Sequence, residues 1–306
     1  MELVRWERRP QLHRPVLITS FEGWNDAGDA ASTAVRYLAA SWGATSFATL
    51  DTEQFYDFTV TRPEVRLVEG ITRQIDWPSI ELSSAPIPGE GRDAVFLIGP
   101  EPQLKWRTFC GSIIEVATTL GVEMAVCLGA LLTDIPHTRP VRVTGTAADP
   151  EMAVQLGLRK SNYEGPTGIL GVLADAFGQA DIAVASLWAT VPHYVSQVPS
   201  PKAALALVER TAELLDVAVS VTELEIGAAA YERQVTERVD ADDDAVAYVR
   251  QLEEAAEDDD DLDDELDDQL DVFEDLDDLD DADLTIPTTD ALAAEVERFL
   301  RDQHRD

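Results

Sequence analysis

Carboxylate and imidazole side chains follow several apolar runs of this sequence, at the points where strands would end. Asp26 and Glu101 come shortly after two such runs, and Asp134, His137 and His193 follow two others. If the runs form parallel strands, their carboxyl ends meet at one edge of a sheet, where ligands usually bind. An acid, a base and nearby arginines at that edge could carry out hydrolysis or phosphorolysis. The competing interpretation is that each side chain caps a turn or forms a salt bridge.

The histidines suggest a second chemistry, the binding of a divalent metal. His137 and His193 each follow a proline, and Asp134 or Asp26 could join them as a ligand. No HxH or HExxH spacing occurs, so we predict no metal site. A serine hydrolase is not indicated either, because the GxSxG turn is absent and Ser112 falls inside a predicted helix.

Residues 22–29 form a loop between a predicted strand and a predicted helix, and we expect function to converge there. Gly23 and Gly28 leave its backbone free to turn tightly or to approach a ligand. No Lys-Ser or Lys-Thr follows the second glycine, and the carboxylates of the loop would repel a phosphate. We therefore predict no cofactor, and we interpret the loop as a turn in which Asp26 or Asp29 caps the helix. The motif residues of this loop are Glu22, Gly23, Trp24, Asn25, Asp26 and Gly28.

Hydrophobic periodicity predicts the elements that would position these side chains. Residues 16–21 are an apolar run typical of a buried strand, and from Ala30 the apolar residues take helical spacing as far as Gly43. Further buried strands are predicted at 94–98, 124–128 and 182–189, with helices over about 104–120, over 169–177 and from Ser200 onward. Apolar runs that alternate with helices indicate an α/β fold whose mainly parallel sheet is covered on both faces.

Between the first helix and Pro78 the sequence has the pattern of short alternating strands. We predict strands at 45–50 and 54–61, and a hairpin formed by 65–68 and 73–75. Four aromatic residues gather in this region: Phe55, Tyr56, Phe58 and Trp77. Few basic residues accompany them, so we interpret the cluster as core or as a subunit contact rather than as a base-stacking platform.

The charge of the chain argues against two classes of partner. The 306 residues carry a formal charge of −36, of which the twenty acidic residues between 253 and 283 contribute −20. Such a chain repels phosphate, so we expect neither nucleic acid nor an anionic membrane surface as a partner. No window reaches the roughly 18 apolar residues of a membrane span, and no secretory leader is recognised. Cys110 and Cys127 have no CxxC spacing, and we expect buried thiols in a cytoplasmic protein.

The sequence beyond Asp216 shows no strong strand pattern. We predict an α/β core domain over 1–220 and a surface extension of charged amphipathic helices over 221–256. Residues 257–285 place like charges at i,i+4, so we predict an acidic, disordered tail there. Residues 286–306 are predicted to form a short C-terminal helix.

Five stretches of the sequence, taken together and in order, are specific enough to identify a family. They are FEGWNDAGDAAS (21–32), IGPEPQLKWRTF (98–109), LGALLTDIPHTRPVRVTGTA (128–147), YEGPTGILGVL (163–173) and ATVPHYVSQVPSPKAAL (189–205). The chain resembles the bacterial branch of the proteasome assembly chaperone 2 family over about residues 3–254. The resemblance implies a three-layer α/β/α fold like that of nucleoside phosphorylases and a tendency to self-associate. It implies little chemistry, and it suggests the proteasome as a partner because eukaryotic relatives help to assemble proteasome α-rings.

The sequence supports two hypotheses about function, a protein-binding factor and an enzyme. The leading hypothesis is a non-enzymatic protein-binding or assembly factor that binds itself and another protein complex such as the proteasome. The alternative is a hydrolase or a nucleoside-phosphorylase-like enzyme that uses Asp26, Glu101, Asp134, His137 or His193. The alternative requires these side chains to converge on one pocket at the carboxyl ends of the strands.

Overall fold

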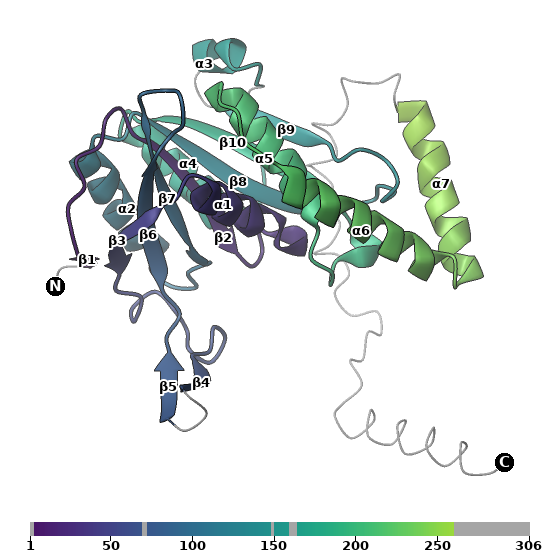
Figure 1. Cartoon of the computed structure of the whole chain (residues 1–306), viewed down its shortest axis with the longest axis horizontal. Helices are drawn as coiled ribbons and strands as arrows, with labels where there is room; N and C mark the ends of the chain where they lie inside the picture. The colour runs from purple at the N-terminus through teal and green to yellow at the C-terminus, as the bar shows by residue number, and fades with distance from the viewer. Residues whose placement is uncertain (1–2, 69–71, 148–149, 159–163, 260–306) are drawn as a thin grey trace. The chain divides into compact units, whose positions relative to one another are not determined.

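A computed structural model of the chain describes residues 3–68, 72–147, 150–158 and 164–259 (Figure 1). These residues fall almost entirely into one compact unit, residues 1–162 and 166–263. A second unit, residues 163–165 and 264–306, contributes only Glu164 and Gly165 to the described part. Most of the predicted acidic tail and the whole of the predicted C-terminal helix therefore lie outside the described residues.

Eight strands form one mixed sheet in the order β1-β3-β6-β7-β2-β8-β10-β9. The four central strands run parallel to one another and are β7 (Asp93–Pro100), β2 (Val16–Glu22), β8 (Met124–Thr133) and β10 (Ala183–Pro192). The outer strands pair antiparallel and are β1 (Val4–Trp6), β3 (Thr45–Leu50), β6 (Ile80–Pro86) and β9 (Val143–Ala147). This arrangement confirms the predicted α/β fold with a mixed sheet.

Helices cover both faces of the sheet and give the three layers that the family resemblance implies (Figure 1). On one face, Val16 and Ile18 of β2 pack in a core with α1 (Ala30–Ser41) and α5 (Pro201–Leu215). On the other face, Leu17 and Phe21 pack in a core with α2 (Trp106–Leu120) and α4 (Ile169–Gln179). Successive residues of β2 thus enter two different cores, which explains why the run is largely apolar and does not alternate with exposed polar residues.

Both helices of the first face begin where the sequence predicts, and α1 also ends there. In α1 the buried residues include Ala31, Ala34 and Leu38, and Gly43 follows the helix with a φ of +70°. In α5 the hydroxyl of Ser200 accepts a hydrogen bond from the backbone N–H of Ala203 at 3.2 Å. Serine capping and a proline in the first turn therefore start this helix as expected.

The region between β3 and β7 departs from the prediction. Residues 54–61 form turns, so the strand predicted there is wrong. Phe55 and Tyr56 are buried in this loop, and the Phe55 carbonyl accepts hydrogen bonds from the backbone N–H groups of Gln103 and Leu104. The predicted hairpin is confirmed as β4 (Glu64–Val68) and β5 (Thr72–Asp76), whereas β6 was not predicted. In Figure 1 this hairpin extends away from the eight-stranded sheet.

The C-terminal part of the described chain is helical. Helix α6 (Thr222–Val239) packs along α5, and α7 (Asp243–Asp259) follows it. Val235 of α6 and Val249 of α7 belong to a small third core that includes Tyr194. The remaining short elements are η1 (Ala27–Asp29), α3 (Pro150–Gln155) and η2 (His193–Val195). The domain boundaries at 220 and 256 stay predictions. No helix in the described ranges is both long and apolar enough to cross a membrane.

Candidate functional site

The loop after β2 is fixed to the start of α1 by the side chain of Asp26. Its Oδ1 accepts hydrogen bonds from the backbone N–H groups of Ala31 at 2.7 Å and Ser32 at 3.1 Å. Asp29 occupies the position next to the helix, but its side chain makes no capping hydrogen bond. Of the two predicted caps, Asp26 therefore satisfies the amides of the first turn.

Burial governs the ionisation of Asp26. The residue is 4 % exposed, and its Oδ2 has no hydrogen-bond partner among the described residues. Desolvation raises the pKa of the carboxyl above its ordinary value of 3.8, although hydrogen bonds from Ser32 and Ala31 oppose the shift. A raised pKa in a loop at a sheet edge is found in catalytic acids. Here the same carboxyl is already engaged by two amides of a helix.

Gly28 brings the loop against the start of α5. Its carbonyl accepts a hydrogen bond from the backbone N–H of Ser200 at 2.7 Å, and its φ is +57°. A Cβ at this position would lie 3.0 Å from the Cβ of Ser200 and 3.2 Å from the carbonyl oxygen of Val198. Both the backbone conformation and the close approach therefore favour glycine.

Glu101, which follows β7, caps a different helix. Its Oε1 accepts hydrogen bonds from Nδ2 of Asn25 at 3.1 Å and from the backbone N–H of Ile169, the first residue of α4, at 3.0 Å. Gly168, directly before α4, has no side chain with which to cap it. A Cβ on Gly168 would lie 2.4 Å from Nδ2 of Asn25, so the loop and the helix start are in close contact. Asn25 thus joins the loop after β2 to both β7 and α4.

Two residues of the motif loop face outward. Glu22 forms a half-exposed ion pair with Arg36 of α1, a type of contact that contributes little to stability. Trp24 is 57 % exposed, whereas its neighbour Asn25 is 1 % exposed. In this loop the side-chain amide of Asn25 and the capping carboxylate of Asp26 are therefore buried, whereas the indole of Trp24 is exposed.

His137 lies in a separate cluster, in the turn after β8. It is 3 % exposed, and its Nδ1 and Nε2 lie 2.7 Å from the Tyr194 hydroxyl and 3.0 Å from Oγ1 of Thr236. The Thr236 hydroxyl donates to the carbonyl of Glu232, so it accepts the hydrogen of Nε2. Nδ1 is then the acceptor and the Tyr194 hydroxyl donates to it. Both ring nitrogens are therefore used to connect this turn to η2 and α6.

Charged groups surround this imidazole without ionising it. Burial, followed by the nearby Lys202 ammonium, lowers the pKa of His137 below 6.5, while Glu232 and more distant carboxylates oppose the shift. Lys202 donates hydrogen bonds to the His137 carbonyl at 2.6 Å and to Glu232 at 2.5 Å. Nearby, Asp134 accepts a hydrogen bond from the Tyr248 hydroxyl of α7 at 3.1 Å. Asp134 and His137 therefore attach the C-terminal helices to the body.

The five predicted catalytic candidates fall into three places. Asp26 and Glu101 meet at the motif loop through Asn25, Asp134 and His137 contact the C-terminal helices, and His193 of η2 is exposed. Sequence reasoning missed the partners of His137, which are Tyr194, Lys202 and Thr236. Tyr194 directly follows the predicted His193, but its contact with a residue 57 positions earlier gives no signal in local spacing.

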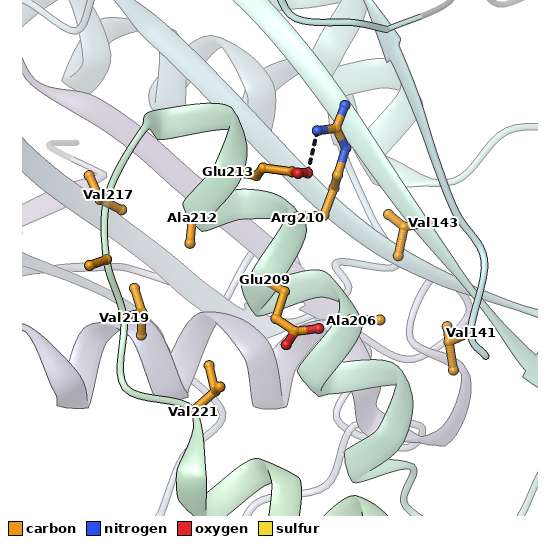
Figure 2. A pocket seen from close by; sticks show the side chains of 11 residues that line it. Val141, Val143, Ala206, Glu209, Arg210, Ala212, Glu213, Val217, Val219 and Val221 are labelled. Atoms are coloured by element: carbon orange, nitrogen blue, oxygen red, sulfur yellow. Dashed lines mark hydrogen bonds and ion pairs between the residues drawn. The ribbon is translucent and has the colours of Figure 1, made fainter.

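One hollow of about 750 Å³ opens beside α5 and β9 (Figure 2). Most of its lining is aliphatic: Val141, Val143, Ala206, Ala212, Val217, Ala218, Val219 and Val221, with Glu209, Arg210 and Glu213. The guanidinium of Arg210 is engaged, because it donates to Glu213 at 2.8 Å and to the Leu156 carbonyl at 3.2 Å. None of the five candidates lines this hollow.

The described residues hold no cluster of metal ligands, and both cysteines are buried. Within residues 3–68, 72–147, 150–158 and 164–259, no three His, Cys, Asp or Glu side chains are grouped so that they could hold a metal ion. Burial raises the pKa of Cys110 to about 11 and that of Cys127 to about 12. Both side chains are therefore thiols at neutral pH.

A family profile and several solved structures resemble this chain. The profile of the PAC2 family matches residues 20–239. A proteasome-assembly chaperone homologue from Mycobacterium tuberculosis is 48 % identical, with 76 % of this chain and 99 % of that chain covered and a TM-score of 0.70. A PAC2 family protein from Streptomyces avermitilis is 47 % identical, with 77 % and 99 % covered and a TM-score of 0.70. PbaB of Pyrococcus furiosus, an archaeal proteasome activator, shares the fold at 16 % identity, with 76 % and 97 % covered and a TM-score of 0.61.

No curated protein matches the chain significantly. The family profile nevertheless spans well over half of the sequence, and it includes the motif loop, the loop after β7 and the turn that holds His137. The chain belongs to the PAC2 family.

Proposed function

We propose that this chain is a non-enzymatic assembly factor that binds another protein complex, such as the proteasome, and also associates with itself in the cytoplasm. The observation that carries the proposal is the orientation of the motif loop. Asn25 and Asp26 are buried at 1 % and 4 % exposure, whereas Trp24 between Gly23 and Asn25 is 57 % exposed. The polar groups of the loop thus hold the fold together, and its largest apolar side chain faces solvent.

An enzyme loop of this kind would present polar groups to a ligand in a concave site. A protein contact instead needs an exposed anchor on a rigid support, and tryptophan is enriched among the residues that dominate binding energy. Leu104, in the loop after β7, adds a second exposed apolar side chain at this edge of the sheet, at 46 % exposure. Glu101 and Asn25 connect the two loops, so both apolar residues have a fixed backbone beneath them.

Relatives support the choice of partner. The Mycobacterium tuberculosis protein that is 48 % identical is a proteasome-assembly chaperone homologue. We extend this role to the present chain as a proposal, with the proteasome subunits of its own organism as the complex to be tested.

The test mixes the purified full chain with the proteasome α and β subunits of the same organism. Binding is measured by sedimentation velocity, and the rate of core-particle formation is followed on native gels. We expect a complex, and we expect Trp24→Ala to weaken it about 30-fold, because truncating a hot-spot residue costs about 2 kcal/mol. Ile226→Ala is the matched control, since Ile226 is 67 % exposed on α6, and it should bind like the wild type.

Two results would overturn the proposal. One is the absence of any complex together with an unchanged rate of core-particle formation. The other is nucleoside phosphorolysis or ester hydrolysis by the purified chain that Asp26→Asn or Glu101→Gln abolishes, which would favour the enzyme alternative.

A further inference from the structure

The hairpin β4–β5 exposes an apolar face. Val65 pairs with Ile75 and Leu67 pairs with Arg73, so these four side chains share one side of the hairpin. The exposed fractions are 61 % for Val65, 60 % for Leu67 and 52 % for Ile75. At the base of the hairpin, Trp77 is 58 % exposed and packs edge-on against Phe58, with ring centroids 5.0 Å apart. An exposed apolar set of this density is typical of a contact surface.

The hairpin also stands apart from the main sheet. Its two strands form a sheet of their own, and neither pairs with a strand of the main sheet. A two-stranded hairpin is marginally stable in water unless further strands or a packed surface support it. On its polar face, Glu64 lies directly across from Asp76, and Arg66 forms an ion pair with Asp76. Facing carboxylates destabilise a strand pair, so a further cation opposite Glu64 would stabilise the hairpin.

Charge favours a second copy of this chain as the occupant. The whole chain carries −36, so two copies repel each other across most of their surfaces. Residues 58–77 are an exception, because their three arginines balance three acidic residues. The apolar face therefore lies on a segment that carries no net charge, so the segment itself adds nothing to the repulsion between two copies.

The charges of β4 favour an axis at Val65 over the axes at its two neighbours. When two copies of one strand pair antiparallel about a two-fold axis, the axis passes through one residue and its own counterpart. An axis at Val65 sets Glu64 opposite the partner subunit's Arg66, and Arg66 opposite the partner subunit's Glu64. An axis at Arg66 would instead set two arginines opposite each other, and an axis at Glu64 would bring Arg62 opposite the partner subunit's Arg66.

We propose that two copies associate edge to edge along β4, with the two-fold axis at Val65. The result is a four-stranded sheet in the order β5-β4-β4-β5, in which Ile75 and Val65 of both copies form one continuous apolar row. The new pairing places an arginine opposite Glu64 and supplies the strands that an isolated hairpin lacks. This inference rests on the self-association proposed above and specifies its surface.

A symmetric disulfide tests the register. Directly opposite residues of antiparallel strands have Cα atoms about 4.5–5.5 Å apart, which lies within the range that a disulfide spans. Val65→Cys in the full chain should therefore form a covalent dimer on mild oxidation, seen on a non-reducing gel. Thr72→Cys is the control, because Thr72 is exposed on the same hairpin but lies on the outer strand. Cys110 and Cys127 are buried and should not react in either variant.

A second variant measures the association itself by sedimentation equilibrium. The wild type should be a dimer or a multiple of one, and Leu67→Asp should dissociate at least about tenfold more readily, because it places a carboxylate on the apolar face. Ile226→Asp, on exposed α6, should leave the association unchanged. Equal melting temperatures for the two variants would show that both are folded.

The outcomes test two claims separately: that the chain associates with itself, and that the hairpin is the surface of that contact. A wild type that associates while Val65→Cys fails to cross-link and Leu67→Asp stays associated would overturn the hairpin surface alone. A monomeric wild type would overturn both. A monomer whose Leu67→Asp variant no longer binds proteasome subunits would assign the hairpin to that partner, and it would equally overturn this inference.

Discussion

Replacing Asp26 should loosen the motif loop and the start of α1 together. Asp26→Ala removes the acceptor of the Ala31 and Ser32 amides. Loss of a helix cap costs about 1–2 kcal/mol. Because Asp26 is 4 % exposed, the amides would be left away from water, which adds about 1–2 kcal/mol. We expect a loss of about 2–4 kcal/mol in the free energy of unfolding, a large part of the total for a typical domain.

Asp26→Asn separates the cap from the charge. Asparagine keeps an acceptor for the two amides but carries no ionisable group, so its cost should be smaller than that of alanine. The pKa of Asp26 is raised by burial in the folded state. Its contribution to stability is therefore fully present below the unfolded value of 3.8 and is lost as the pH rises through the folded pKa. The cost of Asp26→Asn relative to the wild type should accordingly shrink as the pH is raised from 4 to 7.

Urea unfolding of the full chain, followed by circular dichroism at several pH values, gives these differences. Asp29→Asn is the matched control, because Asp29 lies in the same loop and makes no capping hydrogen bond. Its effect should stay below about 1 kcal/mol. A wild-type stability for Asp26→Ala would refute the capping argument. A cost of Asp26→Asn that grows toward pH 7 would show that the amide donors outweigh desolvation.

Three further predictions follow from other contacts. Glu101→Ala should lower the free energy of unfolding in urea by about 1–3 kcal/mol, because it leaves the Ile169 amide unpaired. Glu101→Gln should keep most of that stability, since it keeps an acceptor. Equal losses for the two variants would contradict the role of Glu101 as a helix cap. The lowered pKa of His137 means that its contribution to stability is present above pH 6.5 and is lost as the pH falls through the folded value. An imidazole titration by NMR with a midpoint at or above 6.5 would argue against this burial effect. Gly28→Ala should cost about 1–3 kcal/mol from its positive φ and its contact with Ser200, while Gly178→Ala in α4, where a Cβ meets nothing within 4 Å, should be neutral or stabilising.

Local patterns in the sequence predict the parts of the fold that local physics decides. The apolar run of β2 and the change to helical spacing at Ala30 are sufficient to predict a buried strand, a turn and an amphipathic helix. Ser200 followed by Pro201 likewise predicts the start of α5, because the cap and the amide it satisfies are three residues apart.

The prediction fails where burial is set by distant segments. Residues 54–61 alternate like a strand, but Phe55 and Tyr56 are buried in a loop that the segment around Gln103 holds by hydrogen bonds. β6 lies beside the parallel centre of the sheet and pairs antiparallel with β7. Its sequence contains two serines and lacks the apolar run by which the central strands are predicted. In both cases the deciding contacts come from tertiary structure.

The same distinction explains why carboxylates at the sheet edge can be mistaken for catalytic groups. Helix α4 starts after Gly168 and α1 starts after Asp29, and neither of these residues caps its helix with a side chain. The free amides of both helices therefore need acceptors from elsewhere, and Asp26 and Glu101 supply them across 5 and 68 residues of sequence. Acidic residues after parallel strands are common to active sites and to remote caps, and the sequence alone does not tell them apart. The distinguishing feature is whether the helix that begins beside the loop has a cap of its own.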